Sequence, residues 1–373
     1  MRILYTMTTI KGNGGVQRII FDKCNYLVAH GYEIAIAYFG TNSDNPSFYV
    51  DYRIKLYPIN VDASNGSALS KIKSLIKSIS IFKHIVSKVR PEVIDNANAI
   101  ILSWLIPFLN RGAKTITELH QSYDGVLIFN KANYGENSIR SKVLMSLRKH
   151  IYPKYDKVVV LTDEDRMKWR LDNCITIPNF TNIHSDKEID YSQKTAIWVG
   201  RLTHQKGVDI FINVLKKLFV KVPDWKYIVI GDGCDSYSKE MKDFVKLHEN
   251  KIHYVRSTDK IQAYYEHASL YISTSRFEGL PLSLIEAATM GLPIVGFKIT
   301  GNDQIVEDEV NGKLAMSFNE DELLDDIMNL MKHQESRIAM GVKAKEIARK
   351  YDKEYVMGQW KKLFEEKTNM TGD

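Results

Sequence analysis

The sequence predicts an α/β protein with two doubly wound, Rossmann-like domains, each a parallel sheet covered by helices, that face a central cleft. Three observations lead to this prediction. Strand-like and helical segments alternate along the chain, several strand-like segments are apolar on both faces, and a polar stretch interrupts the alternation near the middle. The length of 373 residues, with 44% hydrophobic and 26% charged residues, suits two globular domains.

The first half of the chain begins with a strand and a glycine loop and then repeats the strand–helix unit. Helical patterns include Gln17–Ala29, Leu69–Arg90 and Ser141–Ile151. The polar, turn-rich stretch Pro178–Gln193 ends this half and is the best linker candidate. The predicted strands are Ile3–Thr9, Ile34–Phe39, Ile54–Tyr57, Val93–Ile94, Thr115–Glu118 and Lys157–Leu161.

The second half restarts the alternation and ends in charged helices over Glu320–Lys367, with a break at Tyr351–Asp352. We expect a first domain over residues 1–185, a second over 186–350, and a C-terminal helix over 351–373 that crosses back to the first domain. The predicted strands are Ala196–Val199, Tyr227–Ile230, Ile252–Val255, Leu270–Ser273 and Pro293–Phe297, and the helices lie near Val208–Phe219, Tyr237–His248, Lys260–Tyr265 and Leu282–Thr289.

Charge is concentrated in the first half, where residues 1–190 carry a net charge of +7 and the remainder carries −1. The densest basic stretch is Leu69–Arg90, a helical pattern with six lysines and arginines and no acidic residue. An amphipathic helix that covers the sheet explains this stretch. The alternative is a helix that binds an anionic membrane through its exposed lysines. Those lysines are Lys71, Lys73, Lys77 and Lys83.

Several classes of partner are excluded by composition. Cys24, Cys174 and Cys234 are far apart and odd in number, so neither a disulfide framework nor a zinc site is expected. Basic patches interleaved with aromatic residues are absent, so we expect no nucleic-acid partner. We therefore expect the protein to be cytoplasmic, and to be peripheral at the inner membrane face if the basic helix binds lipid.

Glycine loops follow three predicted strands, where doubly wound sheets bind ligands. The first loop contains Gly14 and Gly15, whose backbone amides at a helix N-terminus can bind an anion. Gln17 stands where a dinucleotide fingerprint requires a third glycine, so a nicotinamide cofactor is disfavoured. In the second loop, Arg201 and Lys206 are two cations that can converge on a diphosphate.

The third loop, Gly231–Gly233, allows close approach of the backbone to a ligand or is simply a turn. A longer pattern follows a later strand, with Glu278 in a glycine–proline turn and Glu286 more than one turn into the next helix. Because Glu286 lies in an otherwise apolar stretch, it needs polar partners if it is buried. Two ribose hydroxyls would satisfy it, and a solvent-facing side chain is the alternative.

The acidic stretch Asp163-Glu164-Asp165 has the spacing of a metal motif. It directly follows a predicted strand and Thr162, so a capped helix N-terminus with acidic residues in its first turn explains it. We therefore expect no metal.

Taken together, Gly14-Gly15, Gly200-Arg201 with Lys206-Gly207, Gly231–Gly233 and Glu278-x7-Glu286 resemble the retaining GT-B glycosyltransferases of family 4, in order and spacing. The resemblance implies a nucleotide-sugar donor held mainly by the second domain, with no cofactor. It implies donor contacts at Gly14, Gly15, Arg201, Lys206, Gly231, Gly233, Glu278, Gly279, Leu280 and Glu286, with the diphosphate on Arg201 and Lys206, the ribose on Glu286 and the sugar beside Glu278.

The resemblance also assigns His120, which ends the strand beginning near Thr115, to a position close to the transferred sugar. Gln17, Arg18 and His120 are the expected acceptor contacts. Catalysis is assigned to His120, Glu278, Arg201 and Lys206, the first two as positioning or electrostatic groups.

The implied activity is transfer of a hexose or N-acetylhexosamine from a nucleotide-sugar, with uridine as the expected base, to a lipid-linked or cell-surface glycan at the inner face of a bacterial membrane. Two alternatives stay open: a nucleotide-sugar epimerase or hydrolase on the same scaffold, and a donor-binding protein without catalysis.

Overall fold

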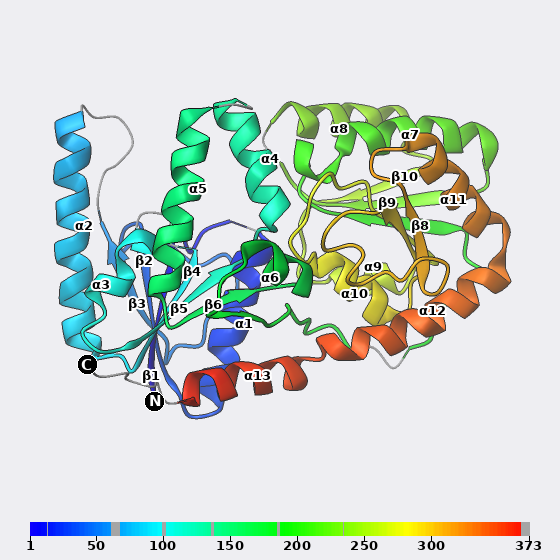
Figure 1. Cartoon of the computed structure of the whole chain (residues 1–373). Helices are drawn as coiled ribbons and strands as arrows, with labels where there is room; N and C mark the ends of the chain where they lie inside the picture. The colour runs from blue at the N-terminus through cyan, green and yellow to red at the C-terminus, as the bar shows by residue number, and fades with distance from the viewer. Residues whose placement is uncertain are drawn as a thin grey trace. The chain divides into compact units, whose positions relative to one another are not determined.

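The computed structural model describes residues 1–12, 14–60, 68–98, 102–135, 138–184, 187–233 and 235–366, so Cys234 and residues 367–373 of the expected C-terminal helix lie outside the described part. The chain divides into two compact units, which we describe separately (Figure 1). The first unit comprises Met1–Ile177 and the chain from Met357 onward, and the second comprises Pro178–Val356.

The first unit is built on a seven-stranded parallel sheet of order β3-β2-β1-β4-β5-β6-β7. The order reverses between β1 and β4, which makes the sheet doubly wound, as predicted. The short strand β7 was not predicted, because three residues give too little alternation to recognise. The strands are β1 (Arg2–Met7), β2 (Glu33–Phe39), β3 (Lys55–Ile59), β4 (Val93–Asn98), β5 (Lys114–Leu119), β6 (Lys157–Val160) and β7 (Cys174–Thr176).

Helices cover both faces of this sheet (Figure 1). Leu4 of β1 belongs to a buried cluster with Phe82 of α2 and Val126 of α4, whereas the neighbouring Tyr5 faces Lys23 of α1. Since successive side chains of a strand point to opposite faces, α2 and α4 cover one face and α1 the other. The helices are α1 (Gly15–Ala29), α2 (Ala68–Val89), α3 (Ile106–Leu109), α4 (Tyr123–Tyr134), α5 (Ile139–Ile151) and α6 (Asp163–Trp169).

The second unit contains a six-stranded parallel sheet of order β10-β9-β8-β11-β12-β13. The strands are β8 (Thr195–Val199), β9 (Lys226–Ile230), β10 (Ile252–Val255), β11 (Leu270–Ile272), β12 (Ile294–Phe297) and β13 (Gly312–Ala315). The helices are α7 (Val208–Lys221), α8 (Ser236–Leu247), α9 (Ile261–Tyr265), α10 (Leu282–Met290), α11 (Glu320–Lys332) and α12 (Gln334–Ala348).

The stretch predicted as a linker is instead packed into the second unit. Phe180 and Ile183 are buried, and the Asn179 amide Nδ2 donates to the Leu280 carbonyl at 2.8 Å. The chain passes from the first unit to the second at the first residue of this stretch, Pro178, and the polar turn residues bond to the backbone of the surface that they cross.

The last helix, α13 (Lys353–Glu365), follows a 3₁₀ turn at Arg349–Tyr351, which confirms the predicted break. Its end is fixed to the first unit. The Lys114 ammonium donates to the carbonyls of Leu363 and Glu366 at 2.6 and 2.8 Å, and the Tyr32 hydroxyl donates to Glu365 at 2.5 Å.

Candidate active site

The predicted residues of the second unit gather where its strand order reverses. The strands β8 and β11 are neighbours, whereas β9 lies on the other side of β8 and β12 on the other side of β11. The connections that leave β8 and β11 therefore run in opposite directions, and this is the position at which doubly wound sheets bind ligands. Arg201 and Lys206 follow β8, and Glu278 follows β11.

The loops after β8, β9 and β11 are packed against one another so closely that glycine is required. Gly231 has φ of +155°, and a Cβ added there would lie 1.8 Å from the carbonyl oxygen of Gly200. Gly207 has φ of +63°, and its Cβ would lie 2.0 Å from the carbonyl oxygen of Thr274. A side chain at either position would push the loops apart.

Hydrogen bonds fix the loop after β8 to the loop after β11. Arg276 makes a two-pronged ion pair with Asp209, at 2.8 and 2.6 Å, and also donates to the His204 carbonyl at 2.9 Å. The Thr274 hydroxyl donates to the Lys206 carbonyl at 2.9 Å. The turn that carries Lys206 is therefore held in place by a neighbouring strand end. Arg276 was not among the predicted site residues, because its partner lies 67 residues away in the sequence.

Two of the predicted catalytic residues meet directly. The Lys206 ammonium nitrogen lies 2.5 Å from Glu278 Oε1, and the two side chains expose 14% and 7% of their surface. Arg201 is exposed and donates to the side chain of Gln205 at 3.2 Å, and Gln205 donates to the Phe277 carbonyl at 3.1 Å. Both predicted cations are thus tied to the loop that contains Glu278.

Glu286 is buried on α10, with 2% of its surface exposed, so the alternative of a solvent-facing side chain is wrong. The Tyr265 hydroxyl donates to Glu286 Oε2 at 2.9 Å. Burial raises the pKa of the Tyr271 hydroxyl, and the Glu278 and Glu286 carboxylates raise it further, which places both carboxylates within electrostatic reach of one side chain. Tyr265 was not foreseen, because it precedes Glu286 by 21 residues.

The turn between Glu278 and α10 is buttressed by the loop after β12. Gly301 has φ of +92°, and a Cβ added there would lie 2.3 Å from the Gly279 carbonyl oxygen. The Leu280 side chain is buried. The predicted donor contacts Gly279 and Leu280 therefore belong to a rigid turn.

The other predicted residues lie in the first unit. Gly14 is the N-cap of α1 and Gly15 its first residue, and the Gly14 carbonyl accepts from the Arg18 amide at 3.2 Å. Arg18 and Gln17 are both half-buried in the first turn of α1, and Arg18 lies beside Asp22. The α1 N-terminus thus presents the backbone amides that the glycine pattern predicted.

His120 follows β5, and its Nε2 lies 3.3 Å from Glu118 Oε2, with 8% of the His120 side chain exposed. Glu118 is also ion-paired with Lys23 of α1. Sequence reasoning missed Lys23. A signal did exist, since Lys23 occupies the apolar face of α1 between Ile20 and Leu27.

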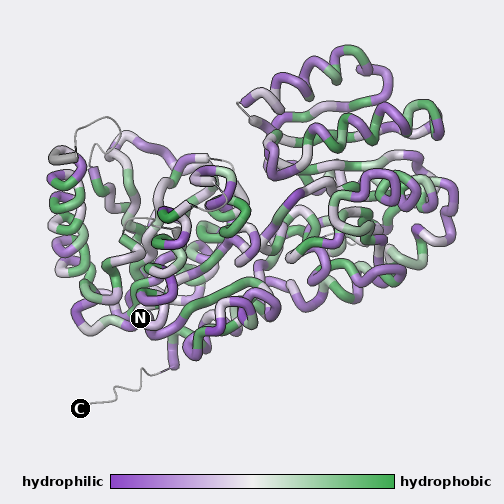
Figure 2. Tube along the Cα trace, turned by 45° about the horizontal axis from the view of Figure 1, so that its top comes forward, coloured by the Kyte–Doolittle hydropathy of each residue, from purple (hydrophilic) through white to green (hydrophobic). Residues whose placement is uncertain are grey.

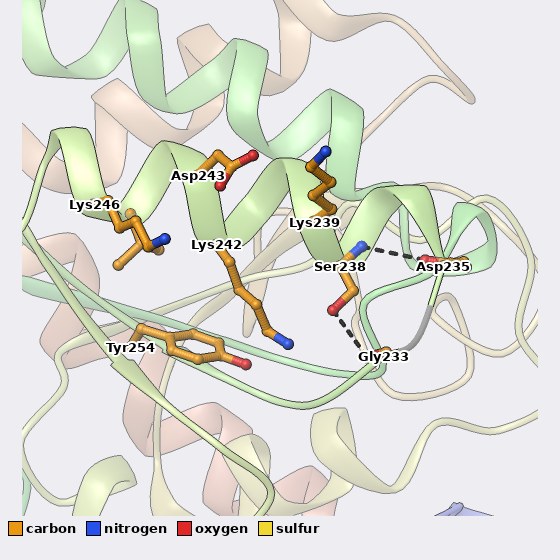
Figure 3. Close-up of a pocket in the computed structure, with 9 residues that line it drawn as sticks. Gly233, Asp235, Ser238, Lys239, Lys242, Asp243, Lys246 and Tyr254 are labelled. Carbon is orange, nitrogen blue, oxygen red and sulfur yellow. Dashed lines mark hydrogen bonds between the residues drawn. The ribbon is translucent and has the colours of Figure 1, made fainter.

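A pocket of about 500 Å³ lies between α8 and β10 (Figure 3). Its lining includes Gly233, Ser238, Lys242 and Tyr254, and the Ser238 hydroxyl donates to the Gly233 carbonyl at 2.8 Å. Gly233 is the one predicted site residue in this lining, which contains neither Arg201 nor Lys206. The pocket therefore borders the glycine loop after β9 from the side of α8.

Within the described ranges, no three His, Cys, Asp or Glu side chains are grouped to hold a metal ion. The acidic stretch after β6 forms the first turn of α6, where the Thr162 hydroxyl accepts from the Asp165 amide at 3.1 Å. The predicted capped helix start is confirmed.

The fold and this arrangement define a glycosyltransferase of the GT-B class, and two family models agree. The family described as Glycosyltransferase Family 4 matches residues 13–184, and the family described as Glycosyl transferases group 1 matches residues 179–347. Together they span both units. The chain belongs to these glycosyltransferases and is a transferase enzyme, as predicted.

Known relatives and structures resemble the chain over most of its length. An uncharacterized glycosyltransferase of Haemophilus influenzae is 28% identical, over 96% of this chain and 99% of the relative. The poly(ribitol-phosphate) alpha-N-acetylglucosaminyltransferase of Staphylococcus aureus is 28% identical, over 87% of this chain and 68% of the relative. The structure of HepE from Anabaena in complex with UDP-glucose has the same fold, with a TM-score of 0.75 at 17% identity, over 97% of this chain and 99% of that chain.

Proposed function

We propose that this protein is a retaining glycosyltransferase that moves a hexose or N-acetylhexosamine from a UDP-sugar to a lipid-linked or cell-surface glycan, without a metal, at the inner face of the bacterial membrane. The observation that carries the proposal is the constellation at the strand reversal of the second unit: the Lys206–Glu278 pair at the loop ends and the buried carboxylate of Glu286. The UDP-glucose bound by HepE supports the donor, and the activity named for the Staphylococcus aureus relative supports transfer of an N-acetylhexosamine to a hydroxyl-bearing polymer.

Donor binding is assigned to side chains that suit each part of a sugar nucleotide. Arg201 and Lys206 take the diphosphate, since two cations neutralise it best. Glu286 accepts hydrogen bonds from two ribose hydroxyls, which gives a buried carboxylate partners beyond Tyr265. Glu278 and the amides of the rigid turn after it face the sugar.

Transfer breaks the bond between the anomeric carbon and the diphosphate oxygen and forms a bond to the acceptor oxygen. Positive charge develops on the sugar ring, and negative charge develops on the departing phosphate. The Lys206 ammonium stabilises that negative charge, and the Thr274 hydroxyl holds the backbone carbonyl of Lys206 in place. The leaving phosphate accepts the proton of the acceptor hydroxyl, so the protein needs no general base. His120 positions the reacting groups.

A panel of UDP- and GDP-sugars, each with and without a lipid-linked glycan acceptor, tests the proposal. We expect release of UDP that requires the acceptor, together with an acceptor that gains one sugar in the α configuration when the donor is α-linked. Sugar isomerisation or free sugar without acceptor would instead identify an epimerase or a hydrolase on the same scaffold.

We further propose that the first unit binds an anionic membrane surface through α2. Its lysines Lys71, Lys73, Lys77 and Lys83 are exposed, and so are the apolar side chains of Ile72 and Ile76, by 54% and 62%. Figure 2 shows hydrophilic and hydrophobic residues alternating along this helix. Such a surface favours anionic lipid, because the lysines meet the headgroups while the apolar side chains enter the interface.

The helix α5 of the first unit has the same character. Ile139, Val143 and Leu147 are spaced four residues apart and expose 80%, 50% and 44% of their surface, and residues 138–154 include no acidic side chain. In the described part of the chain, none of the helices combines the length and apolar character needed to cross a bilayer.

Reversal of the four α2 lysines to glutamate should abolish sedimentation with vesicles that contain acidic lipid, and should leave transfer to a soluble acceptor intact. The matched control reverses four exposed lysines of the second unit, Lys221, Lys239, Lys242 and Lys246, and should not change vesicle binding. Binding that survives the α2 reversal would refute the membrane proposal and leave the transfer proposal unaffected.

A further inference from the structure

A cluster of ionisable side chains is buried in the first unit, on the face of the sheet that α1 covers. The Lys23 and Glu118 side chains expose 1% and 2% of their surface, and Asp95 of β4 is fully buried. An unpaired charge in such surroundings costs several kcal/mol, so the cluster must be compensated internally. The proposed function uses only His120, which lies at the edge of this cluster.

Glu118 is the centre of the cluster and uses each of its oxygens for a different partner. Oε1 accepts from the Lys23 ammonium, and Oε2 lies 3.3 Å from Nε2 of His120. Burial alone would raise the pKa of Glu118, but Lys23 and His120 lower it to about 2. Glu118 is therefore an anion at neutral pH that faces a lysine on one side and an imidazole on the other.

Asp95 faces the same cluster from β4. Neither of its carboxyl oxygens has a hydrogen-bond partner among the residues that the structure describes. Burial raises the pKa of Asp95 well above its ordinary value, and the charge of Glu118 raises it further. Burial and the Glu118 charge thus both favour the protonated form of Asp95, while the charges of Lys23 and Glu118 offset one another.

Aromatic rings hold the Lys23 ammonium from the other side. Its nitrogen lies 3.7 Å from the centre of the Trp360 ring of α13 and 5.5 Å from the centre of the Tyr5 ring. Both rings offer a face to the cation. The lysine, and through it the Glu118 carboxylate, is therefore fixed in place by the C-terminal helix.

We infer that Glu118, held by Lys23, is a positioning residue that determines which nitrogen of His120 meets the substrate. In a neutral imidazole one nitrogen carries the proton and the other keeps its lone pair. Nε2 makes no hydrogen bond in the described part of the chain, so it is the negative charge of Glu118, 3.3 Å away, that favours the proton on Nε2. Nδ1 is then the acceptor that remains for a hydroxyl of the sugar or of the acceptor. The inference rests on the proposed function, in which His120 positions those groups.

The proton position can be measured directly by NMR on protein labelled with ¹⁵N-histidine, in which the signals of His120 are those missing from His120→Gln. We expect the wild-type ring to be protonated on Nε2, and the Glu118→Gln ring to be a mixture of both forms. Lys23→Met/Glu118→Gln should give the same mixture, and it removes both buried charges together, so no unpaired charge is left to prevent folding. Thr117→Val, on the opposite face of β5, is the control and should keep the wild-type pattern.

Activity provides the second readout. Glu118→Gln should lower kcat by about 10-fold to 100-fold, the range found when a metal-bound histidine loses the partner that orients it, with little change in the donor KM. A His120 ring that stays protonated on Nε2 alone in both Glu118 variants would overturn the inference. If the ring changes as expected but His120→Gln keeps full activity, the positioning by Glu118 stands and the role proposed for His120 fails.

Discussion

Each unit contains a lysine–glutamate pair, and the two pairs differ in their access to solvent. Lys23 and Glu118 of the first unit expose 1% and 2% of their side chains, and Trp360 covers the lysine. Lys206 and Glu278 of the second unit expose 14% and 7% and lie in loops that follow β8 and β11. The lysine–glutamate pair is therefore almost fully buried in the first unit, whereas in the second unit it is somewhat more exposed and lies in loops at the strand ends.

The largest difference that we expect between the two pairs is in their contribution to the stability of the protein. Lys23→Met leaves the Glu118 carboxylate buried without its main partner, which should lower the free energy of unfolding by about 3–5 kcal/mol. The matched variant Lys206→Met leaves Glu278 with 7% of its side chain exposed, against 2% for Glu118, and should cost less. Urea denaturation at pH 7 measures both. Equal losses in the two variants would show that burial does not distinguish the pairs.

For catalysis we expect the lysine of the second unit, Lys206, to matter most. Lys206→Ala should reduce kcat by about 10²-fold to 10³-fold, since it removes a preorganised charge at the leaving group. The control is Lys217→Ala, because Lys217 pairs with Asp321 at an exposed position of α7. Steady-state kinetics with the donor identified in the panel gives both values. Wild-type turnover in Lys206→Ala would remove this lysine from the mechanism.

The buried carboxylate of α10 is expected to act on donor binding. Glu286→Ala should raise the donor KM by about 10-fold to 100-fold, because hydrogen bonds to a charged group contribute about 1.5–3 kcal/mol each. Tyr265→Phe, which removes the hydroxyl that bonds to Glu286 but keeps the carboxylate, should have a smaller effect. A donor KM that Glu286→Ala leaves unchanged is the result that contradicts the assignment to ribose.

The smallest effect that we predict is a pH dependence of the unfolding free energy, caused by Asp95 of the first unit. The raised pKa of Asp95 means that the folded protein binds a proton that the unfolded chain releases above its ordinary pKa near 3.8, so stability from this group is lost as pH rises toward the folded pKa. Asp95→Asn removes that loss. The variant should gain stability over wild type as pH rises above 3.8, by at most about 1.4 kcal/mol per pH unit. A difference in unfolding free energy that stays constant with pH would show that Asp95 is charged in the folded protein.

Local sequence patterns predicted most of the fold and most of the candidate site residues in the second unit. Strand–helix alternation predicted both sheets, and the Glu278-x7-Glu286 spacing predicted two carboxylates in the correct loop and helix. The strand β13 escaped prediction because its four residues, Gly312–Ala315, include a glycine and a lysine and lack a clear alternation.

Contacts between distant segments could not be predicted. Lys23 meets Glu118 across 95 residues, and Trp360 reaches the same cluster from α13. Arg276 and Asp209, which fix the Lys206 turn, are 67 residues apart. Only the folded sheet, which aligns the ends of non-consecutive strands, brings these side chains together.

The most direct test of the central claim is a crystal structure of the protein with an intact UDP-sugar. We predict that the diphosphate lies within hydrogen-bond distance of the Lys206 ammonium and that the ribose hydroxyls donate to Glu286. A nucleotide bound elsewhere, with no phosphate at Lys206 and with Glu286 bonded only to protein groups, would contradict the account.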